Sequence, residues 1–374
     1  AGGEEDAGGE GAGPTPGQAA HRNTLTGPHP HHSLLFLFLA LTLGVAVMHL
    51  GPKLVGVQPT VLLFALGMAT SLLVRGLGLS GSMGVLGDSY EMWMGIDPQL
   101  LLSSLLPPLI MSAGMTIDGA LWEHTFRQCL FLAGPGILIQ AAPLTAFFRL
   151  YFGWSVLLSL SVAAILCATD PVAVVALLKE LGASPVLTML LEGESMLNDG
   201  SAIVLYTVVH NMLAGDHYEV STVLMFLLRT VLTAWALGMF VGYFFCTWIR
   251  LAEDKLEPHR ETIQILLTIC AAYLSFILAE GVFNLSGLLS TVACAVVLAR
   301  KMWPFIISKD SINHVWHTVE SLANIVIFFL AGALSGVALL SEYIRAVDYG
   351  HLLVVYLVLH LIRGALVFSS LPLL

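Results

Sequence analysis

Four carboxylates lie within a stretch of the sequence that is otherwise as apolar as a membrane helix. These four, Asp170, Glu192, Glu194 and Asp199, are set among runs of Ala, Val, Leu and Ile between positions 165 and 207. A charged side chain at bilayer depth costs about 2.5–3.5 kcal/mol on insertion scales, so an acid kept there indicates a function. The first question is therefore what these acids bind.

Asp199 follows Asn198 at the centre of an apolar span. The residues one helical turn away carry no basic group: Ser195, Met196, Ala202 and Ile203. Burial disfavours the charged form of a carboxylate, so Asp199 is expected to hold either a proton or a small cation near neutral pH. A residue that trades one for the other performs cation/proton exchange, and Ser195 is a candidate for the ion path. The alternative is a polar pair that only joins two helices.

Thr169, Asp170 and Pro171 predict a second part of the same site. The proline removes a backbone donor and clashes with the preceding turn, so the helix is expected to break in mid-membrane. The freed carbonyls, the Thr169 hydroxyl and the Asp170 carboxylate are then oxygen ligands for Na⁺, together with Asp199 and with Asn198 beside it. Asp170 also suits the N-cap of a helix that starts at Pro171, and the two roles are compatible.

Glu194 is expected to serve a structural purpose. It precedes Asp199 by five residues and so points about 140° away from it on an ideal helix. Two basic residues, Arg229 and Arg363, lie within apolar spans, and a buried acid without a partner is too costly to retain. We expect Glu194 to pair with Arg363 as a clamp between two helices. Glu192 could instead face an aqueous vestibule or take the place of Glu194 in the pair.

Weaker polar signals occur in the segment ESLANIVIFFLAG. Asn324 could face the ion path or could bridge helices, and both roles remain open. Glu320 and His317 are expected to form an interfacial pair, with the mouth of a cytoplasmic funnel as the alternative.

Composition places these residues in an all-helical polytopic membrane protein. The chain is 57% hydrophobic and 11% charged, with a mean hydropathy of +0.86, far more apolar than a soluble domain. The five cysteines show no CxxC spacing and are expected to be packing residues, neither disulfide nor zinc ligands. The net charge of −10 argues against a nucleic-acid partner, and no cofactor is expected besides the transported ions.

The chain divides into a tail and a transmembrane domain. Residues 1–32 are rich in Gly, Pro and acids and are expected to be disordered, whereas residues 33–374 form the membrane domain in contact with the lipid bilayer. Segment 76–98 is expected to be an aqueous or interfacial loop. If the N-terminus lies outside, the loops that face inside hold more basic residues than the loops that face outside. The positive-inside bias therefore predicts an outside N-terminus. The apolar spans are expected at 33–50, 57–75, 99–113, 127–150, 154–180, 187–212, 220–249, 261–280, 284–300, 314–340 and 350–370, eleven in all.

The segment CATDPVAVVALLKELGASPVLTMLLEGESMLNDGSAIVLY (167–206) carries a family resemblance. Its TDP and GES-x-x-ND patterns resemble the core of the sodium/proton exchangers of the monovalent cation/proton antiporter family, most closely the plasma-membrane salt-tolerance type. The resemblance extends from about Ser33 to the end. It implies a thirteen-helix fold with two inverted repeats of six helices, discontinuous crossing helices, a homodimer, and a core domain that moves as an elevator.

The resemblance also implies roles for single residues. Asp199 carries the ion and the proton, Asn198 marks an electroneutral exchanger, and Thr169 with Asp170 belongs to the unwound crossing helix. Glu194 and Arg363 match a salt bridge of the family core. Asn324 departs from the acid that many animal exchangers carry there, so the resemblance does not carry a regulatory acid over to this position.

The end of the chain also departs from the family pattern. The segment LIRGALVF around Arg363 imitates a Gly-Leu-Arg-Gly motif, yet its position fits the eleventh helix. We therefore expect the sequence to stop before the last two helices and any cytoplasmic tail.

The sequence thus predicts a secondary active antiporter, not an enzyme, that exchanges Na⁺ for H⁺ electroneutrally at the plasma membrane and serves pH regulation and salt tolerance. K⁺ or Li⁺ in place of Na⁺ is the nearest alternative. A cation channel is a further one, since pores also select cations with acids. An intramembrane aspartyl protease could use Asp170 and Asp199 as a pair, but the Gly-x-Gly-Asp context is missing.

Overall fold

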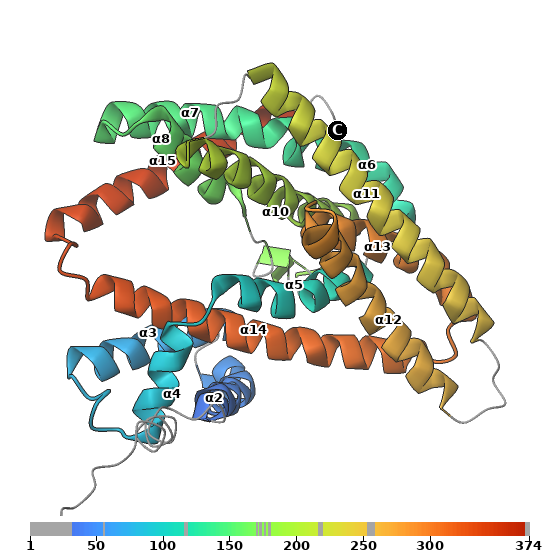
Figure 1. Ribbon diagram of the computed structural model, residues 1–374, viewed down its shortest axis with the longest axis horizontal. Helices are drawn as coiled ribbons and strands as arrows, with labels where there is room; N and C mark the ends of the chain where they lie inside the picture. The colour runs from blue at the N-terminus through green and yellow to red at the C-terminus, as the bar shows by residue number, and fades with distance from the viewer. Residues whose placement is uncertain are drawn as a thin grey trace, which may run out of the picture.

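The computed structural model describes residues 32–54, 57–115, 119–169, 171, 174–175, 177–178, 181–215, 220–252 and 259–370 (Figure 1). Within these ranges the regular elements are helices, and eight apolar spans are long enough to cross a membrane. The chain is therefore an all-α polytopic membrane protein, as predicted. Most of the predicted disordered tail, residues 1–31, lies outside the described residues.

The N-terminal half contributes seven helices to the described part of the chain. They are α2 (Ser33–Leu54), α3 (Pro59–Gly76), α4 (Val85–Met94), α5 (Pro98–Met115), α6 (Gly119–Ala133), α7 (Pro135–Phe152) and α8 (Val156–Cys167).

The C-terminal half contributes six α-helices to the described part of the chain. They are α10 (Pro185–Leu213), α11 (Val220–Leu251), α12 (Arg260–Ile277), α13 (Gly287–Lys301), α14 (Lys309–Leu339) and α15 (Ala346–Ser370). Because α8 and α13 are short and α10 carries acids, these three are not among the eight long apolar spans. The count of eleven spans stays a prediction.

The segment predicted as a loop, 76–98, contains the helix α4, so that prediction is wrong for its second half. The side chains of α4 are used within the protein: the Ser89 hydroxyl accepts from the Phe36 N–H at 3.0 Å, and the Tyr90 hydroxyl lies 2.6 Å from that of Ser71. These bonds join α4 to α2 and α3. The glycines and acids of this segment are typical of a loop exposed to water. The loop prediction failed because the polar groups of α4 bind neighbouring helices instead.

Glycine and proline act differently in two of the N-terminal spans. The span predicted at 127–150 is divided at Gly134 into α6 and α7, with Pro135 at the first position of α7. By contrast, Pro107 and Pro108 lie inside α5, which continues through them. Both prolines are buried, so this part of α5 faces the protein interior.

The lower half of the molecule in Figure 1 is built on a close contact between α3 and α14, which lie side by side. A Cβ added at Gly67 would overlap the carbonyl oxygen of Phe329, and one added at Gly332 would overlap that of Phe64. The two backbones therefore touch, as small residues allow where helices associate in a membrane.

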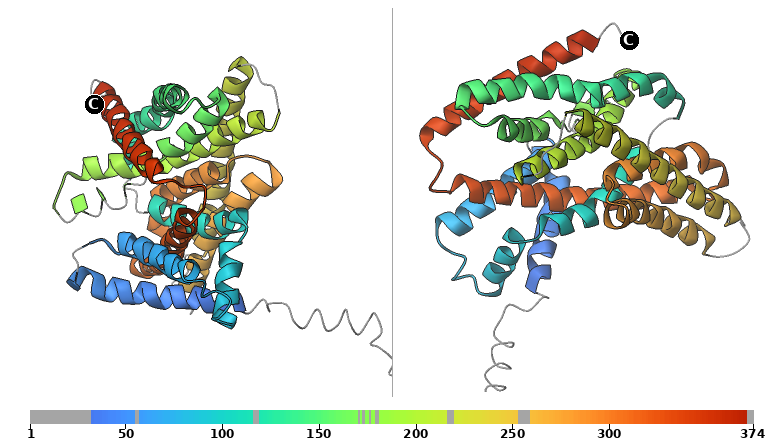
Figure 2. Two further views of the ribbon diagram at one scale, coloured as in Figure 1. Left: turned by 90° about the vertical axis from the view of Figure 1, so that its left-hand side faces the viewer. Right: turned by 45° about the horizontal axis from the view of Figure 1, so that its top comes forward.

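A second group of helices positions the polar residues of the sequence. Helix α15 leaves the end of α14 and returns along α7 (Figures 1 and 2), and α7 packs on α8, which packs on α10. The four helices share an apolar cluster. Its buried members are Ile137, Ala141, Leu144, Phe148, Ala163, Ala164, Cys167, Ala202, Leu205 and Val209, with Val355, Val358 and Ile362 packed against them.

The contact between α3 and α14 predicts how one methyl group alters stability. Gly67→Ala should lower the free energy of unfolding by about 1–3 kcal/mol, because the added Cβ must push α3 away from the backbone of α14. The matched control is Gly76→Ala at the end of the same helix, where the added methyl group meets nothing within 4 Å. Thermal melting of the detergent-purified protein measures the difference. Equal melting temperatures for the two variants would contradict this packing.

Candidate cation site

The helix that carries the TDP motif is interrupted, as predicted. Helix α8 ends at Cys167, and Ala168 adopts an extended conformation with φ −68° and ψ 129°. Helical hydrogen bonding reappears at the Val175 N–H, which donates to the Pro171 carbonyl at 2.8 Å. The break leaves the last carbonyl groups of α8 without partners inside their own helix.

Side chains of α10 supply the missing donors. The Asn198 amide donates to the Cys167 carbonyl at 3.0 Å and approaches the Thr169 hydroxyl oxygen at 3.4 Å. The Ser195 hydroxyl donates to the Thr169 carbonyl at 2.9 Å. Helix α10 is thus bonded to the broken segment at three oxygen atoms. Three predicted site residues, Thr169, Ser195 and Asn198, lie together.

The other amide atom of Asn198 is free. The side chain is 1% exposed, and its Oδ1 has no hydrogen-bond partner among the residues that the structure describes. Buried polar atoms are nearly always paired, so an unpaired carbonyl-type oxygen beside the break has the chemistry of a cation ligand. Asp199, the next residue of α10, is half-buried. Asp170 lies outside the described residues, and its part in the site stays a prediction.

A buried ion pair lies on the other side of Asn198. The Arg363 guanidinium of α15 donates through Nη2 to Oε1 of Glu194 on α10. Glu194 is 4% exposed, and about a fifth of the Arg363 side chain is exposed. It is Glu194, not Glu192, that forms this pair, and the other basic candidate, Arg229, is exposed on α11.

Sequence reasoning missed a third member of this group. Gln140 of α7 is fully buried, and its Oε1 accepts from Nη1 of Arg363 at 3.4 Å. The signal was present, because Gln140 is a polar residue within an apolar run, but nothing in the sequence indicated that α7 and α15 are neighbours.

The weaker polar signals have separate outcomes. Glu320 does not pair with the exposed His317; it accepts instead from the Ser112 hydroxyl of α5 at 2.7 Å, which joins α14 to α5. The predicted interfacial pair is therefore wrong, since the relevant neighbour lies more than two hundred residues away in sequence. Asn324 is half-buried on α14, and both of its predicted roles stay open.

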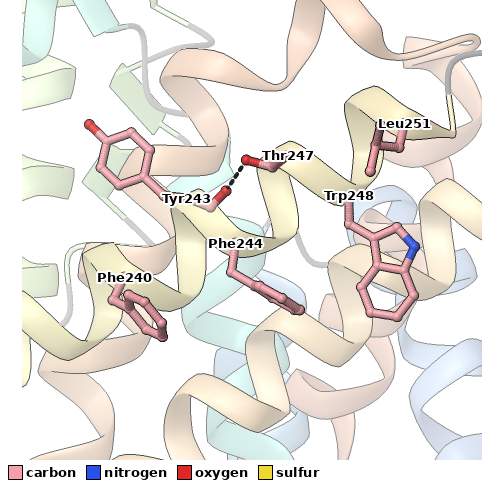
Figure 3. A pocket seen from close by; sticks show the side chains of 6 residues that line it. All are labelled: Phe240, Tyr243, Phe244, Thr247, Trp248 and Leu251. Atoms are coloured by element: carbon pink, nitrogen blue, oxygen red, sulfur yellow. Dashed lines mark hydrogen bonds between the residues drawn. The ribbon is translucent and has the colours of Figure 1, made fainter.

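A shallow hollow on the surface of α11 differs from this site in chemistry (Figure 3). Its lining carries no acid and comes from a single helix: Phe240, Tyr243, Phe244, Thr247, Trp248 and Leu251. The Lys301 ammonium lies 4.6 Å from the centroid of the Tyr243 ring. Exposed aromatic rings on a membrane-length helix are suited to contact with lipid, not to cation binding.

Membrane-length helices, together with a broken helix whose carbonyls accept from buried polar side chains of α10, form the arrangement from which membrane transport folds build their ion sites. A family model described as "Sodium/hydrogen exchanger, transmembrane" matches residues 35–374. The chain belongs to this family.

Individual relatives agree with the family assignment. The chain is 34% identical to "Sodium/hydrogen exchanger 7" of Arabidopsis thaliana over 81% of its length, and 31% identical to "Sodium/hydrogen exchanger 8" of the same plant over 92%. It spans only 26% and 46% of the lengths of these two relatives.

A solved structure shows the same fold. The sodium proton antiporter MjNhaP1 from Methanocaldococcus jannaschii matches with a TM-score of 0.70 at 19% identity, over 91% of this chain and 78% of that one. The predicted antiporter fold is therefore confirmed.

The ion pair predicts the effect of stranding one charge. Glu194→Gln and Arg363→Ala should each lower the stability by about 3–5 kcal/mol, because each leaves a buried charge without its partner. The control is Arg75→Gln, which breaks the exposed pair with Glu91 and should cost at most about 1 kcal/mol. Surface expression and thermal melting measure both effects. Equal melting temperatures for all three variants would show that the buried pair stabilises the protein no more than the exposed pair does.

Proposed function

We propose that this protein is a secondary active antiporter that exchanges Na⁺ for H⁺ electroneutrally. The observation that carries the proposal is the juxtaposition of the broken helix with Asn198, whose buried Oδ1 is unpaired one residue before Asp199. The names of the relatives, which are sodium/hydrogen exchangers and antiporters, support Na⁺ and H⁺ as the pair of ions. K⁺ is the second candidate substrate, and Li⁺ a third.

Competition for one carboxylate explains exchange. When Asp199 is protonated, no charge is available to hold a cation; when the proton leaves, Na⁺ takes its place and the net charge of the site is unchanged. The oxygens of Thr169 and Asn198, with Asp170, complete the ligand set for the ion. Proton and cation cannot occupy Asp199 together, and the empty site would carry an uncompensated negative charge that is costly inside the membrane. The site therefore changes its access only when loaded, so net transport of Na⁺ in one direction requires H⁺ in the other.

The clamp has a mechanical role in this proposal. Arg363 joins α10 to α15, and Asn198 joins α10 to the end of α8. These helices therefore keep their relative positions while the site changes its access from one side of the membrane to the other, as in an elevator.

The setting of the transporter is also proposed. Excess basic residues on one side support an outside N-terminus. The resemblance of segment 167–206 to the plasma-membrane salt-tolerance exchangers supports a plasma-membrane homodimer that serves pH regulation and salt tolerance.

Removing the acid tests the proposal directly. Asp199→Asn should abolish Na⁺ uptake driven by a proton gradient in vesicles, because a neutral amide cannot trade a proton for a cation. The protein should still fold, and Asp88→Asn, at an exposed aspartate of α4, should transport normally. A channel would collapse the membrane potential instead, and a protease would do neither. Gradient-driven uptake by the Asp199→Asn variant would refute the assignment.

The competition also fixes the direction of the pH dependence. As the pH falls, protons occupy Asp199 and exclude Na⁺, so the apparent KM for Na⁺ should rise about tenfold for each unit of pH below the midpoint. Saturating Na⁺ should restore the rate. An apparent KM that did not change with pH would show that the two ions bind at different groups.

A further inference from the structure

Gln140 is a buried polar residue that the transport cycle described above does not use. It is fully buried on α7, and its Nε2 has no hydrogen-bond acceptor within the described part of the chain. An amide in apolar surroundings is costly unless it is bonded. Its Oε1 has one partner, Nη1 of Arg363 at 3.4 Å. The presence of Gln140 is therefore explained by Arg363 and not by the packing of α7.

The guanidinium of Arg363 thus has two acceptors on two different helices. Nη2 binds the carboxylate of Glu194 on α10, and Nη1 binds the amide oxygen of Gln140 on α7. Glutamine has the size and shape of glutamate but carries no charge. The three side chains together are neutral, whereas a glutamate at position 140 would give the group a charge of −1.

The neutrality of this group matters because of where it lies. Residues 137 and 141 of α7 and Ile362 of α15 pack in one cluster with Cys167. The carbonyl of Cys167 accepts from Asn198 in the cation site. An uncompensated charge in this apolar cluster would act on the cation site with little solvent screening.

We propose that Gln140 is the neutral second acceptor of Arg363: it shares the guanidinium with Glu194, and its lack of charge limits the affinity of the cation site for Na⁺. The inference rests on the function proposed above. A transported ion must bind well enough to enter and weakly enough to leave. A second carboxylate at position 140 would strengthen binding and slow release, which explains why the second acceptor of Arg363 is an amide.

A charge exchange across Arg363 tests the shared contact without any measurement of transport. Glu194→Gln alone strands the arginine and should be poorly stable. The double variant Glu194→Gln with Gln140→Glu moves the acid to the other acceptor position, so its melting temperature should return to within a few degrees of the wild type. A double variant as unstable as Glu194→Gln alone would overturn the shared contact.

The apparent affinity for Na⁺ tests the second part of the proposal. Gln140→Glu, with Glu194 retained, should lower the apparent KM for Na⁺ about three- to tenfold at alkaline pH and reduce the maximal rate, because the added charge holds the ion. Gln140→Leu should lower stability and leave the KM unchanged, and the charge-exchanged double variant should have the KM of the wild type. An unchanged KM in Gln140→Glu would overturn this part.

Gln264 provides the matched control. It is another buried glutamine, on α12, and its amide atoms bind the backbone of Phe305 and Ile307. Gln264→Glu should lower stability and leave the KM for Na⁺ unchanged; a lowered KM here would show that any buried acid has this effect. Uptake by Asp199→Asn refutes the proposed function, whereas the melting of the charge-exchanged variant decides the Gln140 contact independently.

Discussion

The structure depends on one constraint: a helix that stops inside a membrane must have its free carbonyl groups satisfied by protein, because lipid offers no donors. Helix α8 stops at Cys167, and Asn198 and Ser195 of α10 donate to the carbonyls there. Those two residues are three apart, so they lie on neighbouring positions of one helix face. The broken helix thereby determines the rotation of α10.

Once that rotation is set, two of the three acids of α10, Glu194 and Asp199, are placed as well. At about 100° per residue, Glu194, Asn198, Ser195 and Asp199 follow one another across an arc of about 140°. Glu194 lies at one edge, where Arg363 binds it, and Asp199 lies at the other. These four residues form one polar stripe along α10. At one edge Glu194 stays charged and paired with Arg363, and at the other edge lies Asp199, the residue proposed to exchange a proton for a cation. The attraction between Glu194 and Arg363 offsets only part of the free energy that it costs to remove both charges from water. The ion pair therefore fixes how α10 and α15 are arranged more than it stabilises the fold.

The sequence predicted the features that depend on local spacing. The apolar spans, the break before Pro171 and the pairing of Glu194 with Arg363 followed from hydropathy, from proline chemistry and from the cost of an isolated charge. Features that depend on which helices are neighbours were not predictable. Gln140 binds Arg363 of α15, and Glu320 accepts a hydrogen bond from Ser112 of α5. The polar side chains of α4 form hydrogen bonds with α2 and α3. Non-local pairing of this kind leaves no periodic signal in one sequence.

The distribution of polar bonds indicates where the molecule can move. The hydrogen bonds around the break join α7, α8, α10 and α15 to one another. Toward α5 and α13, by contrast, α6 and α10 present apolar side chains that share one cluster with Ile110, Leu288 and Val292. Gly200, beside Asp199, lies against Leu288 and Leu289. The ion pair described across this boundary, between Arg300 and Glu123, is exposed and therefore weak. A displacement along this apolar surface would break few polar contacts, whereas a displacement within the polar group would strand Arg363 and the carbonyls of α8.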